Sequence, residues 1–321
     1  MLDVHRLRLL RELSRYGTIA ETARMSSLTP SAVSQQLSAL EREVGTALFV
    51  RDGRRLMFTE AARVLVEHAE RILAELEEAR AHVAELTSEV VGTLRLAAFP
   101  TAARALVPLA LARCKEAHPD LRVRLSEQET EVAIKALRSG HLDAALIYEY
   151  NLLPRVREPG VEISVLLREP LLVAVPAGPH DAGPRDAGPV TLSELADRPW
   201  IAAQRDDALH AMFERACGLA GFAPRIEHTS NDYTVIFALV RAGLGVALVP
   251  RLAEEPQPTV EPSSGGTHHL REIADLQLSR TVAVAIRSGS RRSPPVAVLL
   301  EELRHAANTL SRELAHPTQR S

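Results

Sequence analysis

One helix and the hairpin behind it constrain the fold of this chain more than any other feature. Thr29 and Pro30 form an N-cap followed by proline at the first helical position, so they predict a helix that runs to about Glu43. The next segment, GTALFVRDGRRLMFT, has two short β-like runs separated by Asp52 and Gly53, which predicts a tight hairpin. A capped helix with a hairpin directly after it is typical of a small winged domain.

Two further helices are predicted before this unit. Leucines at helical spacing mark an amphipathic helix over Val4–Tyr16, and Gly17 ends it as a left-handed C-terminal residue would. Thr18 then caps a short helix over Ile19–Met25. Three helices followed by a hairpin predict a winged helix-turn-helix in residues 1–58.

The third predicted helix has an apolar face and a polar face. Val33, Leu37 and Leu40 are spaced to face a core, while the opposite side chains are short and largely uncharged. Such side chains suit base edges in a DNA major groove, because Gln can pair with adenine and Ser reaches several edges. An ordinary solvated face is the alternative. The candidate base contacts are Thr29, Pro30, Ser31, Ser34, Gln35 and Ser38.

Basic side chains at the hairpin support a nucleic-acid partner. Arg51, Arg54 and Arg55 lie at or beside its tip, where a wing meets phosphates, and Thr18 is a fourth candidate for the DNA backbone. The formal net charge of the chain is −3, but nine Arg and six Asp or Glu give residues 1–58 a charge of +3 and leave −6 elsewhere. A basic head on an acidic body fits a DNA-binding module joined to another domain.

A long helix is predicted next, from the N-cap Thr59 to about Ser88. Its apolar residues advance in steps of four and three, the spacing of a coiled-coil seam. One helix beside a small domain cannot bury such a seam, so pairing with a second copy is the favoured interpretation; packing on the chain's own C-terminal part is the alternative. The seam residues are Leu65, Ala69, Ile72, Leu76, Ala79, Val83 and Leu86, of which all but the alanines are candidate dimer contacts.

The remaining two thirds alternate β-like and helical runs, which predicts a parallel α/β arrangement. The first unit has strands at Leu94–Ala98, Leu121–Ser126 and Asp143–Tyr148, with helices over residues 100–117 and 130–140 between them. The second begins near Ser164, with strands at Leu171–Val175, Trp200–Ala202 and Gly245–Val249 and helices near 207–220 and 232–242. The expected boundaries are 1–58, 59–91, 92–165 with 289–312, 166–288, and a tail 313–321.

A small-molecule site is expected between these two units. Ligands of such sheets bind beyond the carboxyl ends of the strands, where helix N-termini supply NH groups. Some of the polar residues there could equally be simple helix caps. The candidate effector contacts are Phe99, Thr101, Ala102, Gln128, Thr130, Tyr148, Gln204, Asn231 and Asp232.

The N-terminal motif resembles the DNA-binding domain of LysR-type transcriptional regulators. The matching residues, in order, are Ala23, Ser34, Leu40, Glu41, Gly45, Leu48, Phe49, Arg51 and Thr59. Phrases such as GTLRLAAF, SGHLDAALIY and RAGLGVALVP extend the resemblance over residues 2–310. Gln35 stands where the family often has arginine, and Ala62 where it usually has glycine; the first departure should alter operator preference. The resemblance implies a long dimer helix and an effector domain similar to periplasmic binding proteins.

The resemblance also implies the partners and the mode of action. It implies a homodimer or homotetramer that binds an imperfect palindromic operator in double-stranded DNA and responds to an unidentified small molecule. The alternatives are a constitutive repressor without a ligand and a solute-binding module. Nothing groups a nucleophile with a base, so no enzyme is expected.

No cofactor, metal site or membrane association is predicted. The sequence has no long apolar span and no signal peptide, which makes the cytoplasm the expected location. The cysteines Cys114 and Cys217 have no metal-ligand spacing and are expected as buried apolar residues, with a redox pair as the alternative. The adjacent His268 and His269 are expected as a solvated pair in a loop.

Overall fold

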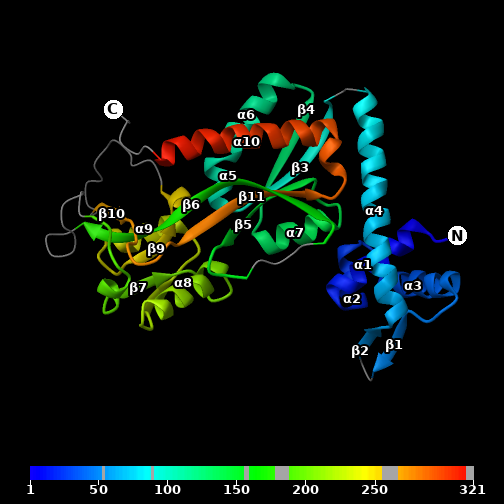
Figure 1. Ribbon diagram of the computed structural model, residues 1–321, viewed down its shortest axis with the longest axis horizontal. Helices are drawn as coiled ribbons and strands as arrows, with labels where there is room; N and C mark the ends of the chain where they lie inside the picture. Colours follow the sequence, from blue (N-terminus) through cyan, green and yellow to red (C-terminus); the bar gives the residue numbers. More distant parts are fainter. Residues whose placement is uncertain (53–54, 88–89, 155–158, 178–187, 255–266, 316–321) are drawn as a thin grey trace.

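The computed structural model describes residues 1–52, 55–87, 90–154, 159–177, 188–254 and 267–315. A small N-terminal domain lies at one end of a long helix, and a larger α/β domain packs beside that helix (Figure 1). None of the helices in these ranges is long and apolar enough to cross a membrane.

The N-terminal domain has the predicted three helices and hairpin. Helices α1 (Val4–Tyr16), α2 (Ile19–Met25) and α3 (Pro30–Val44) precede strands β1 (Phe49–Asp52) and β2 (Arg55–Phe58). The local signals act as expected, since Gly17 ends α1 at φ 72° and Thr18 accepts a hydrogen bond from the backbone NH of Glu21. The core of this domain is formed by buried apolar side chains from these helices, from the segment before β1 and from the start of α4, among them Leu7, Leu10, Leu13, Val33, Leu37, Leu40, Leu48 and Ala62.

Helix α4 (Glu60–Thr87) connects the two domains and packs on both. Thr59 caps it by accepting a hydrogen bond from the Ala62 NH at 3.2 Å. Near its start Ala69 is buried in the N-terminal core, and farther along Leu73 and Ala81 are buried. Gly289 lies so close to α4 that a Cβ there would overlap the carbonyl oxygen of Ala74. The helix is therefore held against the α/β domain along its middle.

The first α/β unit has the predicted parallel strands. Strands β3 (Gly92–Ala98), β4 (Leu121–Glu127) and β5 (Ala144–Tyr150) form it, and α7 (Thr130–Arg138) connects the last two. The predicted single helix over residues 100–117 is wrong in one respect, since it divides into α5 (Pro100–Ala105) and α6 (Val107–Ala117). Pro108 lies at the start of α6 and has no NH to continue the hydrogen bonds of α5.

Two long strands cross the α/β domain. Strand β6 (Val161–Ala177) has 17 residues, three times the length of the predicted Leu171–Val175 strand. Its first part pairs with β11 (Ser279–Arg287), and its second part pairs with β10 (Thr267–Arg271) and β9 (Ala247–Pro250). The sheet order is β10-β6-β11-β5-β3-β4. Strand β11 thus pairs with β5, although it falls within the range 166–288.

The second α/β unit contains helices and short strands near one end of β6 (Figure 1). Strands β7 (Pro199–Ala202) and β8 (Arg225–Thr229) are parallel, with α8 (Ala208–Leu219) between them and α9 (Tyr233–Arg241) following. The chain then returns along β11 to α10 (Pro294–Ala315), which packs on α6 and the sheet of the first unit. The sequence did not predict β8, β10 or β11. His268 and His269 lie on β10, so their expected place in a loop is wrong.

The close approach at Gly289 gives a test of how α4 is held. Gly289 and Gly221 both have positive φ, 86° and 87°, but a Cβ at Gly221 would meet nothing within 4 Å. Gly221→Ala should cost only the backbone strain, about 1–2 kcal/mol. Gly289→Ala should cost about 1–3 kcal/mol more, because its methyl group meets the α4 backbone. Urea unfolding of both variants measures the difference, and equal losses of stability would show that α4 is not held at Gly289.

Candidate DNA-reading surface and effector cleft

The α3 face predicted to read DNA is fully accessible. All six candidate base contacts, Thr29, Pro30, Ser31, Ser34, Gln35 and Ser38, are exposed. They share one side of the helix because Val33, Leu37 and Leu40 on the other side are buried in the domain core. In Figure 1, α3 and the β1–β2 hairpin lie at the end of the molecule far from the α/β domain.

Local hydrogen bonds fix the hairpin relative to α3. The Glu41 carboxylate on α3 accepts hydrogen bonds from the backbone NH groups of Leu48 and Phe49, at 2.9 and 3.2 Å. Phe49 and Phe58 then meet edge to face, with ring centroids 5.3 Å apart. Glu41 was singled out in the sequence only as part of a motif, and its role as a positioning residue for the wing is visible in the structure.

The predicted backbone contacts lie around this surface. Thr18 is exposed and caps α2. Arg51 lies on β1 and Arg55 on β2, while Arg54 lies outside the described residues. The hairpin register, in which Asp52 pairs with Arg55, places both strand arginines next to the tip.

The predicted dimer seam on α4 divides into two parts. Leu65 packs against the core of its own N-terminal domain. Ile72, Leu76, Val83 and Leu86 are exposed, with Val83 and Leu86 at 66% and 85% of their full accessibility. The side of α4 that packs on the α/β domain carries Leu73 and Ala81 instead, so the seam beyond residue 70 is left uncovered within one chain.

A small cavity lies between the two α/β units. It has a volume of about 20 Å³, enough for roughly one water molecule. Four of the nine candidate effector contacts line it: Phe99, Thr101, Tyr148 and Asn231. The structure thus brings together four of the predicted residues from segments more than 130 positions apart in the chain.

The other five candidates do not line this cavity. Ala102 is fully buried in the core of the first unit, and Gln128 donates a hydrogen bond to Ser126 Oγ. Thr130 accepts a hydrogen bond from the Tyr148 NH, Gln204 donates its NH to Asn231 Oδ1, and Asp232 caps α9. Three of these five, Thr130, Gln204 and Asp232, form contacts that position residues lining the cavity.

The sequence missed the charged residues of the cleft. Arg280 on β11 is fully buried and pairs with Glu169 on β6, with 2.7 Å between guanidinium nitrogen and carboxylate oxygen. The same guanidinium donates to Thr101 Oγ at 2.8 Å and lies 5.0 Å from the centre of the Phe99 ring. The position of Arg280 directly before the largely apolar run TVAVAI was the one available signal. The other polar lining residues that were not predicted are Glu129, Tyr150, Asp207, Ser230 and Tyr233.

Burial changes the acidity of the groups around the cavity. Burial raises the pKa of Glu129, although the Tyr148 hydroxyl that donates to it at 2.9 Å acts in the opposite direction. Burial also raises the pKa of Asp207, which caps α8, and holds the pKa of Tyr148 far above its usual range. The cavity is thus bordered by one internally paired cation, two carboxyl groups and neutral phenols.

The two cysteines belong to separate cores. Cys114 packs in the core of the first α/β unit and Cys217 in that of the second. Burial raises the pKa of the Cys114 thiol to about 11 and that of Cys217 to about 12, so both are neutral at physiological pH. Within the described ranges, no group of three or more His, Cys, Asp or Glu side chains is arranged to hold a metal ion.

The arrangement of an exposed reading helix, a wing, a long connecting helix and a two-unit α/β domain defines a DNA-binding regulator with a sensor domain. Residues 4–63 match the family described as "Bacterial regulatory helix-turn-helix protein, lysR family", and residues 87–308 match "LysR substrate binding domain". The chain belongs to the LysR family of transcriptional regulators.

Curated relatives and solved structures agree with this assignment. A probable hydrogen peroxide-inducible genes activator of Mycobacterium avium is 30% identical over 83% of this chain and 81% of the relative. A malonate utilization transcriptional regulator of Klebsiella pneumoniae is 28% identical over 81% of this chain and 87% of the relative. HinK from Pseudomonas aeruginosa has the same fold, with a TM-score of 0.58 at 20% identity over 95% of this chain and 98% of HinK.

The buried ion pair at the cleft predicts that removing one partner lowers the folding stability much more than removing both. Arg280→Met leaves the Glu169 carboxylate buried without its cation, which should cost about 3–5 kcal/mol of folding stability. Adding Glu169→Gln removes that charge, and the amide oxygen can still accept from the Leu252 NH, now at 2.6 Å from Glu169 Oε2. The double variant should recover most of the loss in urea unfolding. Equal stabilities of the single and double variants would contradict this account.

Proposed function

We propose that this regulator binds an imperfect palindromic operator in double-stranded DNA, with α3 in the major groove and the wing on phosphates. The observation that carries the proposal is the exposed α3 face, which offers hydroxyl and amide groups and no acidic side chain before Glu41. Ser34 and Gln35 are the proposed base-reading residues at its centre. Arg51, Arg54, Arg55 and Thr18 are the proposed backbone contacts.

A homodimer formed through α4 accompanies this proposal. The exposed seam residues Ile72, Leu76, Val83 and Leu86 lie on the side of α4 that the chain's own domains leave open. A symmetric pairing of two such helices buries this seam and places two α3 helices on one duplex, which is why a palindromic operator is expected. A tetramer built from two such dimers is compatible with the same interface.

We also propose that a small-molecule effector binds in the cleft between the α/β units. Phe99, Thr101, Tyr148 and Asn231 are the proposed contacts, joined by Arg280. The cavity volume is only about 20 Å³, so a ligand larger than a water molecule can enter only if the two units separate. Binding of such a ligand would therefore change the distance between the units. Malonate and hydrogen peroxide, which are named in the descriptions of two relatives, serve here only as compounds to screen.

A constitutive repressor without an effector is the second candidate, and the small cavity favours it. Thermal unfolding of the full chain with a metabolite library separates the two, since a ligand at about 100 times its dissociation constant adds about 2.7 kcal/mol. In either case we place the protein in the cytoplasm with the DNA, assign it no catalytic role, and retain the expected domain boundaries.

The α3 face and the wing should contribute differently to DNA binding. Ser34→Ala with Gln35→Ala should reduce discrimination between operator and unrelated DNA, by about 1–3 kcal/mol for each base-reading hydrogen-bonded pair that the variant removes. Arg54→Ala with Arg55→Ala should weaken binding to both DNAs. It should also reduce the steepness of log K against log salt concentration by about 0.9 for each phosphate that an arginine neutralises.

These affinities can be measured by fluorescence anisotropy between about 50 and 200 mM salt, on the operator found by genome-wide mapping of bound DNA. Arg304→Gln, on an exposed part of α10, serves as the control and should leave both quantities unchanged. Loss of specificity from the wing variant with no effect of the α3 variant would overturn the assignment of α3.

The dimer proposal can be tested at the most exposed part of the seam. Val83→Asp places a charge where two α4 helices would meet and should convert the dimer into monomers. Arg71→Asp introduces the same side chain at an exposed position off the seam and should leave the dimer intact. Light scattering after size-exclusion chromatography measures both masses. A dimer that survives Val83→Asp and Leu76→Asp together would place the interface elsewhere.

A further inference from the structure

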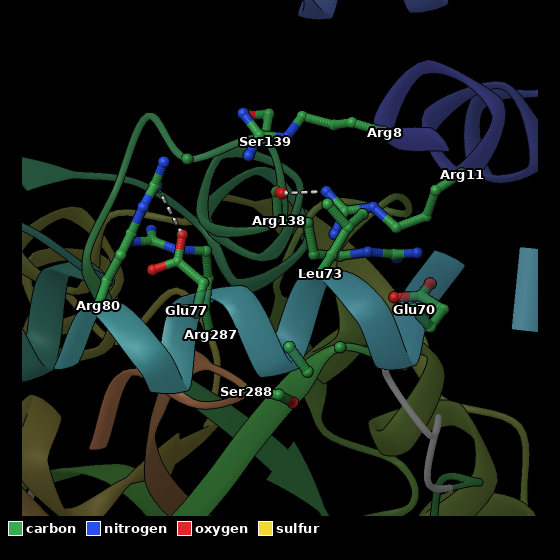
Figure 2. Close-up of a pocket in the computed structure, with 13 residues that line it drawn as sticks. Arg8, Arg11, Glu70, Leu73, Glu77, Arg80, Arg138, Ser139, Arg287 and Ser288 are labelled. Atoms are coloured by element: carbon green, nitrogen blue, oxygen red, sulfur yellow. Dashed lines mark hydrogen bonds and ion pairs between the residues drawn. The ribbon is translucent and has the colours of Figure 1, made fainter. Parts of the chain in front are cut away.

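A second cavity lies where the N-terminal domain, α4 and the α/β domain meet. Its volume is about 260 Å³, more than ten times that of the cleft. Figure 2 shows side chains from three sources around it: Arg8 and Arg11 from α1, Glu70, Glu77 and Arg80 from α4, and Arg138, Ser139, Arg287 and Ser288 from the α/β domain.

The lining of this junction cavity is strongly basic. Five arginines and two glutamates line it, which gives a net charge of +3. Adding the neighbours that pair with these groups, Arg15, Glu12 and Asp143, still leaves +2. Burial and the nearby Arg11 lower the pKa of Arg8, and burial lowers the pKa of Arg15 to about 10. Folding has therefore gathered like charges here without enough carboxylates to neutralise them.

Several cations around the cavity already have fixed partners, and two are available. Arg11 donates to the Arg138 carbonyl at 3.1 Å and pairs with Glu12, while Arg287 donates to the Leu142 carbonyl. Among the residues that the structure describes, Arg80 has only a long contact to Glu77, 3.7 Å between nitrogen and oxygen. Arg8 forms no hydrogen bond or ion pair with any described residue. The guanidinium groups of Arg8 and Arg80 can therefore turn to a ligand without breaking a hydrogen bond.

The backbone at the end of α7 does not oppose an anion, although carbonyl groups gather at any helix C-terminus. The Arg138 carbonyl accepts from Arg11, and the Leu137 carbonyl accepts from the Gly140 NH at 3.1 Å. The Ala136 carbonyl accepts from the NH groups of His141 and Leu142. These three carbonyl groups are thus occupied, and the five arginines against two glutamates give the lining its net positive charge.

We propose that the junction cavity is a binding site for a compact phosphate-bearing anion. Guanidinium groups match phosphate oxygens in paired hydrogen bonds, and a dianion or trianion neutralises an excess of two to three positive charges. Arg8 and Arg80 are its principal ligands, from α1 and α4, with Arg138 on the third side. A bound anion connects the DNA-binding domain to the α/β domain at a place independent of the cleft.

The proposal is tested by calorimetric titration of the full-length chain, without DNA and at constant ionic strength. Inorganic phosphate and pyrophosphate are the probes, and chloride replaces them in the reference titration. Both probes should bind once per chain. Arg8→Gln and, separately, Arg80→Gln should weaken binding about tenfold, the effect of removing one charge-assisted hydrogen bond. The control Arg304→Gln should bind as the unaltered chain does.

Hydrogen exchange locates the site independently. Phosphate should slow amide exchange in peptides covering residues 8–15 and 138–141, and this protection should be absent in Arg8→Gln. A millimolar dissociation constant is expected, so about 10 mM phosphate, roughly ten times that constant, should nearly saturate the site. The absence of a saturable binding heat up to this concentration would overturn the proposal. Equal binding by Arg8→Gln, Arg80→Gln and Arg304→Gln would also overturn it, because the anion would then bind elsewhere.

Discussion

The crossing of β6 and β11 is the constraint on which the α/β domain depends. These two strands pair with each other and are shared by both units, and Glu169 and Arg280 lie directly opposite in their register. Their ion pair is buried, so each charge is stable only in the presence of the other. Arg280 also reaches Thr101 on α5, and Glu169 accepts from the Leu252 NH. One polar cluster thus sets how closely the two units approach and how small the cleft is.

Helix α4 imposes a second constraint, because its faces have different partners. The face that includes Ala74 is held against the α/β domain at Gly289. The opposite face presents Ile72, Leu76, Val83 and Leu86 to solvent. A helix fixed on the Ala74 side joins the α/β domain directly to the N-terminal domain that carries α3. The basic junction cavity lies beside the fixed face, where an anion can alter that coupling.

Prediction from the sequence was most successful where structure is specified locally. Caps such as Thr18, Thr29 and Thr59 and the hairpin at Asp52 gave the N-terminal domain almost residue by residue, because each signal acts within a few positions. The full length of β6 was missed because Pro170 and the charged residues before it interrupt the apolar run. Strands β8, β10 and β11 depend on pairing with distant segments, which no local pattern records.

The candidate site was likewise predicted where a general rule applies and missed where distant residues pair. Phe99, Thr101, Tyr148 and Asn231 were found because they follow strand ends in an α/β order, a topological rule. Arg280 was missed because its partner Glu169 is 111 positions away, and the signal at Arg280 does not point to that partner. The junction arginines were missed for the same reason, since Arg8, Arg80 and Arg138 come together only after the domains have packed.

Comparison with one relative shows that a shared fold does not by itself imply a shared ligand. This relative is described as a probable activator of hydrogen peroxide-inducible genes, yet the two thiols here lie in separate cores with pKa values raised to about 11 and 12. A peroxide sensor that works through cysteine needs an accessible thiolate, and neither Cys114 nor Cys217 supplies one. The cleft of this chain offers instead a neutralised arginine beside two carboxyl groups. The fold places the sensor, and the side chains at each site determine what it senses.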